Sequence, residues 1–159
     1  MTNADVALRD LVERHGWAVV KISEDERGPG FAYTVGLSRS FGHPEVLISG
    51  LDLVVLQEIL NEIGAKIRDG ATFSAGHGSD DVLEGYPVTF REIAPAAFGT
   101  YLGAGVRFYG DMTFAALHCI WPDKAGRFPW DAGVVEWVRW AQPALSDGPE
   151  ATTFDRPAS

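Results

Sequence analysis

The stretch Asp52–Gly70, DLVVLQEILNEIGAKIRDG, contains the most regular apolar pattern of the chain. Asp52 is a good N-cap residue, and Gly70 follows the last apolar position. The apolar residues between them recur at the three- and four-residue spacing of one helix face, and they are Val55, Leu56, Ile59, Leu60, Ile63 and Ile67. This spacing predicts a long amphipathic helix that covers a β-sheet.

The segments before this helix supply the first strands of that sheet. Three of them are rich in the β-branched and aromatic residues that strands favour: Trp17–Ser23, Phe31–Leu37 and Glu45–Ser49. Residues 38–44 separate the last two as a turn. Ahead of them, Asn3 can cap a helix that we expect over about residues 4–15.

The segments after the helix contain two more strands and two shorter helices. The glycine-containing stretch Ser74–Glu84 predicts a mobile loop. We expect strands at Val88–Ile93 and Met112–Trp121. Pro95 can open a short helix, and Asp131 can cap a final helix that Pro143 ends.

Helices and strands alternate without a regular βαβ pattern, which indicates an α+β fold. We expect a mainly antiparallel sheet covered by two to four helices. Residues 1–145 would form a single domain, and residues 146–159 a disordered C-terminal tail.

The acidic composition argues against some partners. The chain has 13 Lys and Arg against 22 Asp and Glu, a formal net charge of −9. Nucleic acids and anionic membranes attract basic surfaces, so we expect neither as a partner. Cys119 is the single cysteine, which rules out an intrachain disulfide and suits a reducing compartment. The first residues lack the pattern of a signal peptide, so we expect a cytoplasmic protein.

A second notable stretch is Trp121–Asp131, WPDKAGRFPWD, which fits neither helical nor strand periodicity. Its two prolines restrict the backbone, so it predicts a rigid loop, which we call the Trp-rich loop (residues 121–131). Trp121 and Trp130 could form a contact surface, or they could seal the core as a structural plug. Asp123 is the polar residue of this loop that we favour for a site.

Other candidate residues lie on the predicted strands. His43 and Glu45 have the two-residue spacing that points both side chains to one face, which suits acid/base chemistry or metal ligation. Adjacent strand residues point apart, so His118 and Cys119 do not predict a nucleophilic pair. We interpret Cys119 as a small buried hydrophobe and His118 as half-buried and hydrogen-bonded.

The ligand-binding candidates are therefore Tyr33, Thr34, His43, Glu45, Trp121, Asp123 and Trp130. We expect Tyr33, His43, Glu45, Trp121 and Asp123 to approach one another around a concave surface. No metal is expected; if one binds, its ligands would come from His43, Glu45, His118 and Asp123.

Four short motifs resemble one known family: Tyr33-Thr34-Val35-Gly36-Leu37, His43-Pro44-Glu45, Trp121-Pro122-Asp123 and Phe128-Pro129-Trp130. Together they make the chain similar to a bacterial family called domain of unknown function 4262. This resemblance implies a small stand-alone bacterial domain. It implies no catalytic residue, substrate or cofactor, and the pattern of that family has Gln at the position of His118.

Three functions remain open. The first is a module that binds a small molecule or a protein through the Trp-rich loop, because the common nucleotide, zinc and hydrolase motifs are absent from the sequence. The second is a flavin-type oxidoreductase, because Thr34–Leu37 and Pro44–Ile48 distantly resemble the start of split-barrel flavin reductases. The third is a metal-binding enzyme that uses His43 and Glu45.

Overall fold

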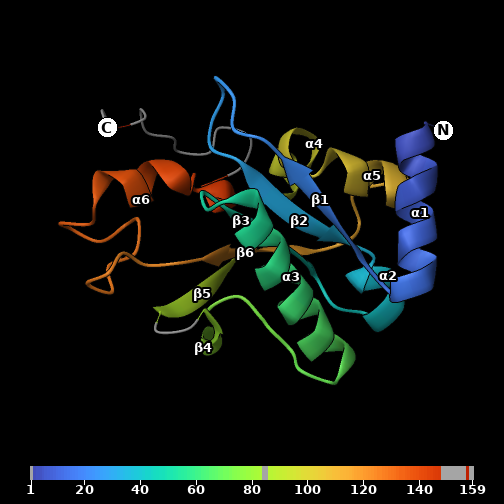
Figure 1. Cartoon of the computed structure of the whole chain (residues 1–159), viewed down its shortest axis with the longest axis horizontal. Helices are drawn as coiled ribbons and strands as arrows, with labels where there is room; N and C mark the ends of the chain where they lie inside the picture. Colours follow the sequence, from blue (N-terminus) through green and yellow to red (C-terminus); the bar gives the residue numbers. More distant parts are fainter. Residues whose placement is uncertain (1, 84–85, 148–156, 158–159) are drawn as a thin grey trace.

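A six-stranded sheet forms the centre of the computed structural model, which describes residues 2–83, 86–147 and 157 (Figure 1). The strand order is β1-β2-β3-β6-β5-β4, and only β3 and β6 pair in parallel. The strands are β1 (Ala18–Ile22), β2 (Phe31–Val35), β3 (Glu45–Ser49), β4 (Gly78–Leu83), β5 (Tyr86–Glu92) and β6 (Ala116–Ile120). The expected α+β fold with a mainly antiparallel sheet is confirmed.

The sheet is open in the described part of the chain, because β1 and β4 lie at its two edges and do not pair with each other. This open sheet is not the split barrel that the flavin-reductase alternative implies.

One face of the sheet is covered by α3 (Leu53–Arg68), the helix that the apolar spacing predicts. Asp52 caps it, because the carboxylate accepts a hydrogen bond from the N–H of Val54 at 2.9 Å. The inner face buries Leu56, Leu60 and Ile63 against the sheet, and α6 (Glu136–Ala141) extends the same apolar cluster. Val55 was expected on this face but is 39% exposed, because it lies at the margin of the apolar stripe.

The opposite face of the sheet packs against α1 (Asn3–His15), α4 (Phe98–Tyr101) and α5 (Gly103–Tyr109) (Figure 1). Strand alternation assigns neighbouring residues to the two sides: Ala32 belongs to the cluster beneath α3, whereas Tyr33 belongs to the cluster beneath α5. The sheet thus separates two apolar clusters.

The N-terminal cap differs from the expectation. Thr2, not Asn3, caps α1: its hydroxyl accepts from the N–H of Asp5 at 3.1 Å, and the carboxylate of Asp5 accepts from the N–H of Thr2 at 3.3 Å. This reciprocal pair is a capping box, so the helix begins one residue earlier than expected.

Two helices were missed. The expected turn at 38–44 contains α2 (Leu37–Phe41), whose first N–H groups bond to the carboxylate of Glu45 at the start of β3. Pro95 opens a 3-10 turn, η1 (Pro95–Ala97), which α4 continues as expected of a short helix, but α5 then follows where no helix was expected.

Two other assignments were wrong. The expected loop at 74–84 contains the edge strand β4, because its backbone pairs with β5 although few of its residues are apolar. Asp131 does not cap α6, whose N-cap residue is Val135; Asp131 instead accepts from the N–H of Phe128 at 2.8 Å within the loop.

The C-terminal segment 146–159 was expected to be disordered. Ser146 and Asp147 belong to a 3-10 turn, η2 (Leu145–Asp147), while residues 148–156 and 158–159 lie outside the described residues. Among the helices of the described residues, none combines the length and apolar character needed to cross a membrane.

Candidate functional site

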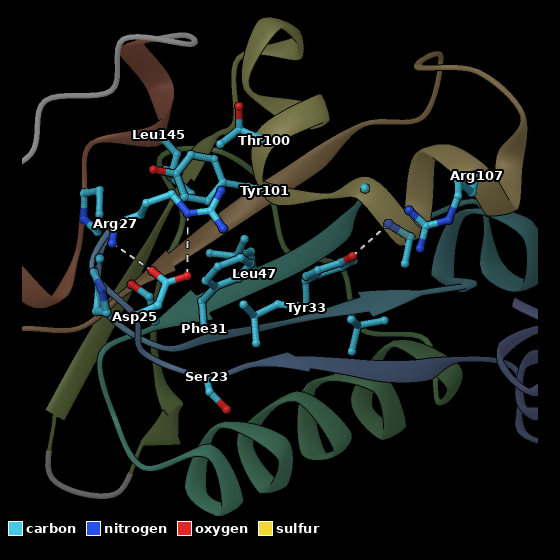
Figure 2. A pocket seen from close by; sticks show the side chains of 18 residues that line it. Ser23, Asp25, Arg27, Phe31, Tyr33, Leu47, Thr100, Tyr101, Arg107 and Leu145 are labelled. Carbon is cyan, nitrogen blue, oxygen red and sulfur yellow. Dashed lines mark hydrogen bonds and ion pairs between the residues drawn. The ribbon is translucent and has the colours of Figure 1, made fainter. Parts of the chain in front are cut away.

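A cavity of about 330 Å³ lies on the sheet face opposite α3 (Figure 2). We call it the sheet-face cavity. Its floor consists of residues from β1, β2 and β3, including Val20, Tyr33 and Leu47. Its walls come from the loop between β1 and β2, from the α4–α5 region and from residues 143–145. The cavity is therefore assembled from segments that are far apart in the sequence.

Aromatic rings dominate the interior of this cavity. Phe31 stacks on Tyr33 with ring centroids 6.3 Å apart, and Tyr101 meets Phe31 edge-on at 5.6 Å. The hydroxyl of Tyr33 accepts a hydrogen bond from the N–H of Ala104 at 3.1 Å. Burial raises the pKa of both Tyr33 and Tyr101, so both hydroxyls stay protonated and can donate to a ligand.

Two arginines lie at opposite ends of the cavity (Figure 2). Arg27 belongs to the β1–β2 loop; its side chain is 92% exposed and lies 3.6 Å from the carboxylate of Asp25. Arg107 on α5 donates to the carboxylate of Asp5 on α1 at 3.1 Å. Each guanidinium has five N–H donors, so one carboxylate contact leaves capacity for a ligand. The cavity offers an apolar, aromatic centre between two cationic ends.

Of the predicted site residues, only Tyr33 lines this cavity. Thr34 and Glu45 are buried instead in a hydrogen-bond network at the start of α2. The hydroxyl of Thr34 donates to Glu45 at 2.9 Å. The N–H groups of Gly36, Leu37 and Ser38 donate to the same carboxylate at 3.2, 3.2 and 3.1 Å.

Tyr109 completes this network, because its hydroxyl donates to the Glu45 carboxylate. Burial raises the pKa of Glu45, although the hydrogen bonds oppose that shift. Burial and the negative charge of Glu45 raise the pKa of Tyr109, which keeps this hydroxyl protonated. The Glu45 carboxylate therefore holds three backbone N–H groups and α5 together.

His43 is also held by the fold. Its Nδ1 lies 2.8 Å from the carbonyl of Pro44, and its Nε2 accepts from the N–H of Phe73 at 3.0 Å. The proton must therefore be on Nδ1. All four polar side-chain atoms of His43 and Glu45 already have hydrogen-bond partners, and no group of three or more His, Cys, Asp and Glu residues in the described segments could hold a metal ion.

The Trp-rich loop is internally braced by Asp123. Its Oδ1 accepts from the N–H groups of Ala125 and Arg127, both at 2.9 Å, and its Oδ2 from that of Val135 at 3.3 Å. These backbone bonds, led by that of Arg127, lower the pKa of Asp123. The carboxylate thus has a structural role within the loop.

The two indoles of the loop have different environments. Trp121 is 7% exposed and donates from Nε1 to the carbonyl of Ser49 at 2.8 Å. Trp130 is 45% exposed, and the guanidinium of Arg91 lies 3.6 Å from its ring centroid. Trp121 therefore seals the core, whereas Trp130 presents a surface.

The expected convergence of Tyr33, His43, Glu45, Trp121 and Asp123 is wrong. Glu45 pairs in register with Ala116 at the start of β6, whereas Asp123 lies beyond the end of that strand. Because β3 and β6 run in parallel, the two carboxylates lie at opposite ends of the pair. The sequence-based reasoning missed four residues of the sheet-face cavity: Arg27, Phe31, Tyr101 and Arg107. Their only local signal was the charge of the two arginines, because Arg27 lies in a predicted loop and Arg107 lies between predicted elements.

His118 and Cys119, which are neighbours on β6, point to opposite sides as expected. Cys119 is fully buried in the cluster beneath α3, and burial raises the pKa of its thiol to about 12, which leaves it a small buried hydrophobe. His118 was expected to be half-buried and hydrogen-bonded. It is 2% exposed, and its Nε2 has no hydrogen-bond partner among the described residues.

These features define a mixed α+β domain with a ligand-sized cavity on one face of an open sheet. The chain belongs to the family described as Domain of unknown function (DUF4262), whose sequence model matches residues 11–135. No curated protein and no solved structure shows significant similarity to this chain. The matched region includes all six strands and both arginines of the sheet-face cavity.

Proposed function

We propose that this domain is a binding module for a small amphipathic organic anion, which it takes up in the sheet-face cavity. The observation that carries this proposal is the aromatic floor between two arginines, Arg27 and Arg107. Small-molecule sites combine a concave, mostly apolar lining with a few polar groups that orient the ligand. The occupant would place its apolar body on Phe31 and Tyr101 and its anionic group on a guanidinium.

The proposal keeps the binding-module function and moves its main site away from the Trp-rich loop. No residue of 121–131 lines the sheet-face cavity. The preferred partner is accordingly a small molecule rather than a protein, because a volume of about 330 Å³ lies in the range of small-molecule sites and the two arginines lie at separate ends of the cavity.

The amphipathic dye 1-anilinonaphthalene-8-sulfonate tests this site, because it joins fused aromatic rings to one sulfonate. We expect saturable binding with one dye per chain. Ile22→Trp should abolish it, because Ile22 lines the cavity and is itself 38% exposed, so the larger ring can enter the cavity with little cost to the fold. Val54→Trp is the matched control, because Val54 is exposed on α3 across the sheet.

The neutral analogue N-phenyl-1-naphthylamine tests the role of the arginines. The single sulfonate can contact only one of the two ends, so either Arg27→Gln or Arg107→Gln should weaken binding of the sulfonate dye by about five- to tenfold, as expected for one lost charge-assisted hydrogen bond, and the other variant should change it little. Binding of the neutral analogue should stay unchanged. Equal dye binding by Ile22→Trp and the wild type, or dye binding by many weak sites, would contradict the proposal.

A further inference from the structure

A second, smaller cavity of about 220 Å³ lies on the same sheet face, beneath the Trp-rich loop. We call it the loop cavity. Residues 143 and 145 line both cavities, so this short segment stands between them. The residues that give the loop cavity its chemistry are Arg91, His118 and Trp130.

The strand register brings two of these residues together. Arg91 on β5 and His118 on β6 are direct partners of an antiparallel pair. Residues directly opposite each other in such a pair point to the same face. The arginine and the imidazole are therefore neighbours, and both line the loop cavity.

His118 lacks the partner that a buried polar side chain normally has. It is 2% exposed, and its Nε2 makes no hydrogen bond within the described residues. Buried polar atoms are almost always hydrogen-bonded, so an unsatisfied one beside a cavity points to a group that is bound there. Burial, with a smaller contribution from the positive charge of Arg91, lowers the pKa of His118 and favours the neutral imidazole, which has one N–H to donate.

The aromatic part of the loop fixes the position of Arg91. Its guanidinium lies 3.6 Å from the ring centroid of Trp130, and Phe128 stacks on Trp130 with ring centroids 5.2 Å apart. A guanidinium stacked on an indole keeps its N–H edge available for a planar acceptor. The side chain of Gln142, which also lines the cavity, is already bonded to the backbone of Trp121 at 2.9 and 2.8 Å.

We propose that the loop cavity is a second binding site, which takes the carboxylate of a small aromatic acid. The carboxylate accepts from the guanidinium of Arg91 and from the Nε2–H of His118, while the ring of the acid lies among Ile120, Pro129 and Trp130. Cavities for drug-sized ligands begin at about 300 Å³, so a volume of about 220 Å³ suits a single-ring acid. This site shares only residues 143 and 145 with the sheet-face cavity.

Benzoate is the probe that tests the proposal, with benzamide as its uncharged isostere. We expect benzoate to shift the imidazole NMR signals of His118 in the full chain to saturation. Arg91→Gln should weaken this binding by at least about tenfold, because it removes the charge that pairs with the carboxylate. Arg39→Gln is the matched control: Arg39 also lies over an aromatic ring, that of Phe108 at 5.8 Å, but away from the cavity.

Benzamide should produce no saturable shift at His118. His118→Phe should lose benzoate binding and unfold at a higher denaturant concentration than the wild type, because it removes the unsatisfied atom. If that variant does not fold, the benzoate titrations of the wild type and of Arg91→Gln, followed by the His118 signals, still test the proposal. The proposal is overturned if benzoate does not move those signals, if Arg91→Gln binds benzoate like the wild type, or if Ile22→Trp abolishes benzoate binding, which would assign the acid to the sheet-face cavity.

Discussion

At the scale of single residues, hydrogen bonding explains how the core accommodates the charged side chain of Glu45. It accepts hydrogen bonds from Thr34, Tyr109 and three consecutive backbone N–H groups. A buried carboxylate is tolerated when its oxygens are satisfied in this way. Its role is to join β3, the start of α2 and α5, which is a structural role rather than the acid/base role that its spacing from His43 suggested.

Glu45→Gln should therefore destabilise the fold. The amide group of Gln presents N–H donors where the carboxylate accepts, so at least one buried donor is left unpaired at a cost of about 1–3 kcal/mol. The free energy of unfolding from urea titration measures this loss. Glu62→Gln on the exposed side of α3 is the control and should change little. If Glu45→Gln has the same free energy of unfolding as the wild type, the hydrogen-bond network of Glu45 does not stabilise the fold.

His118 should make stability depend on pH. Burial, with a smaller contribution from Arg91, lowers its pKa from 6.5 to about 3 in the folded protein. Below pH 6.5 the unfolded chain binds a proton that the folded one does not, so stability falls as the pH falls from about 6.5 toward 3, by up to about 1.4 kcal/mol per pH unit. Unfolding free energies at several pH values measure this slope.

The comparison with His118→Phe isolates this contribution. The variant should lose stability more slowly than the wild type as the pH falls from about 6 to 4, because it has no proton to bind on unfolding. His15→Phe, on the exposed surface of α1, should keep the slope of the wild type. Identical slopes for the wild type and His118→Phe would show that His118 titrates normally.

At the scale of elements, a helix or strand is predictable when its own residues specify it. α3 was predicted with its cap because its apolar period and Asp52 are local properties. α2 and β4 were not, because their formation depends on partners in the next element of the chain: the Glu45 carboxylate on β3 for α2 and the backbone of β5 for β4. The cap of α6 was misassigned because Asp131 bonds within its own loop.

α3 also contains a glycine that tertiary packing requires. A Cβ at Gly64 would lie 2.5 Å from the ring of Trp17, whose Nε1 donates to Asn61 at 3.1 Å. Gly64→Ala should therefore destabilise the fold by about 1–3 kcal/mol through overpacking, although alanine is the better helix former.

Gly99→Ala is the matched control for this substitution. Gly99 is also helical, but a Cβ there meets nothing within 4 Å, so alanine should be neutral or stabilising. Denaturant midpoints of both variants measure the difference. If Gly64→Ala is as stable as Gly99→Ala, the close packing of Trp17 on α3 is wrong.

At the scale of the whole molecule, the candidate site was the least predictable part. The sequence singled out Tyr33, but the sheet-face cavity also needs residues from the β1–β2 loop, the α4–α5 region and the segment after α6. No local pattern joins these segments, because the sheet brings them together. The Trp-rich loop was identified, yet only tertiary contacts separate the buried Trp121 from the exposed Trp130.

The central claim is that the sheet-face cavity binds a small amphipathic anion, and chemical-shift mapping tests it most directly. A titration of the ¹⁵N-labelled protein with 1-anilinonaphthalene-8-sulfonate should shift the backbone signals of residues 22–33 and 100–107, which surround the cavity. The signals of α3, across the sheet, should stay in place. Shifts centred on α3, or spread over the surface without saturation, would contradict the account.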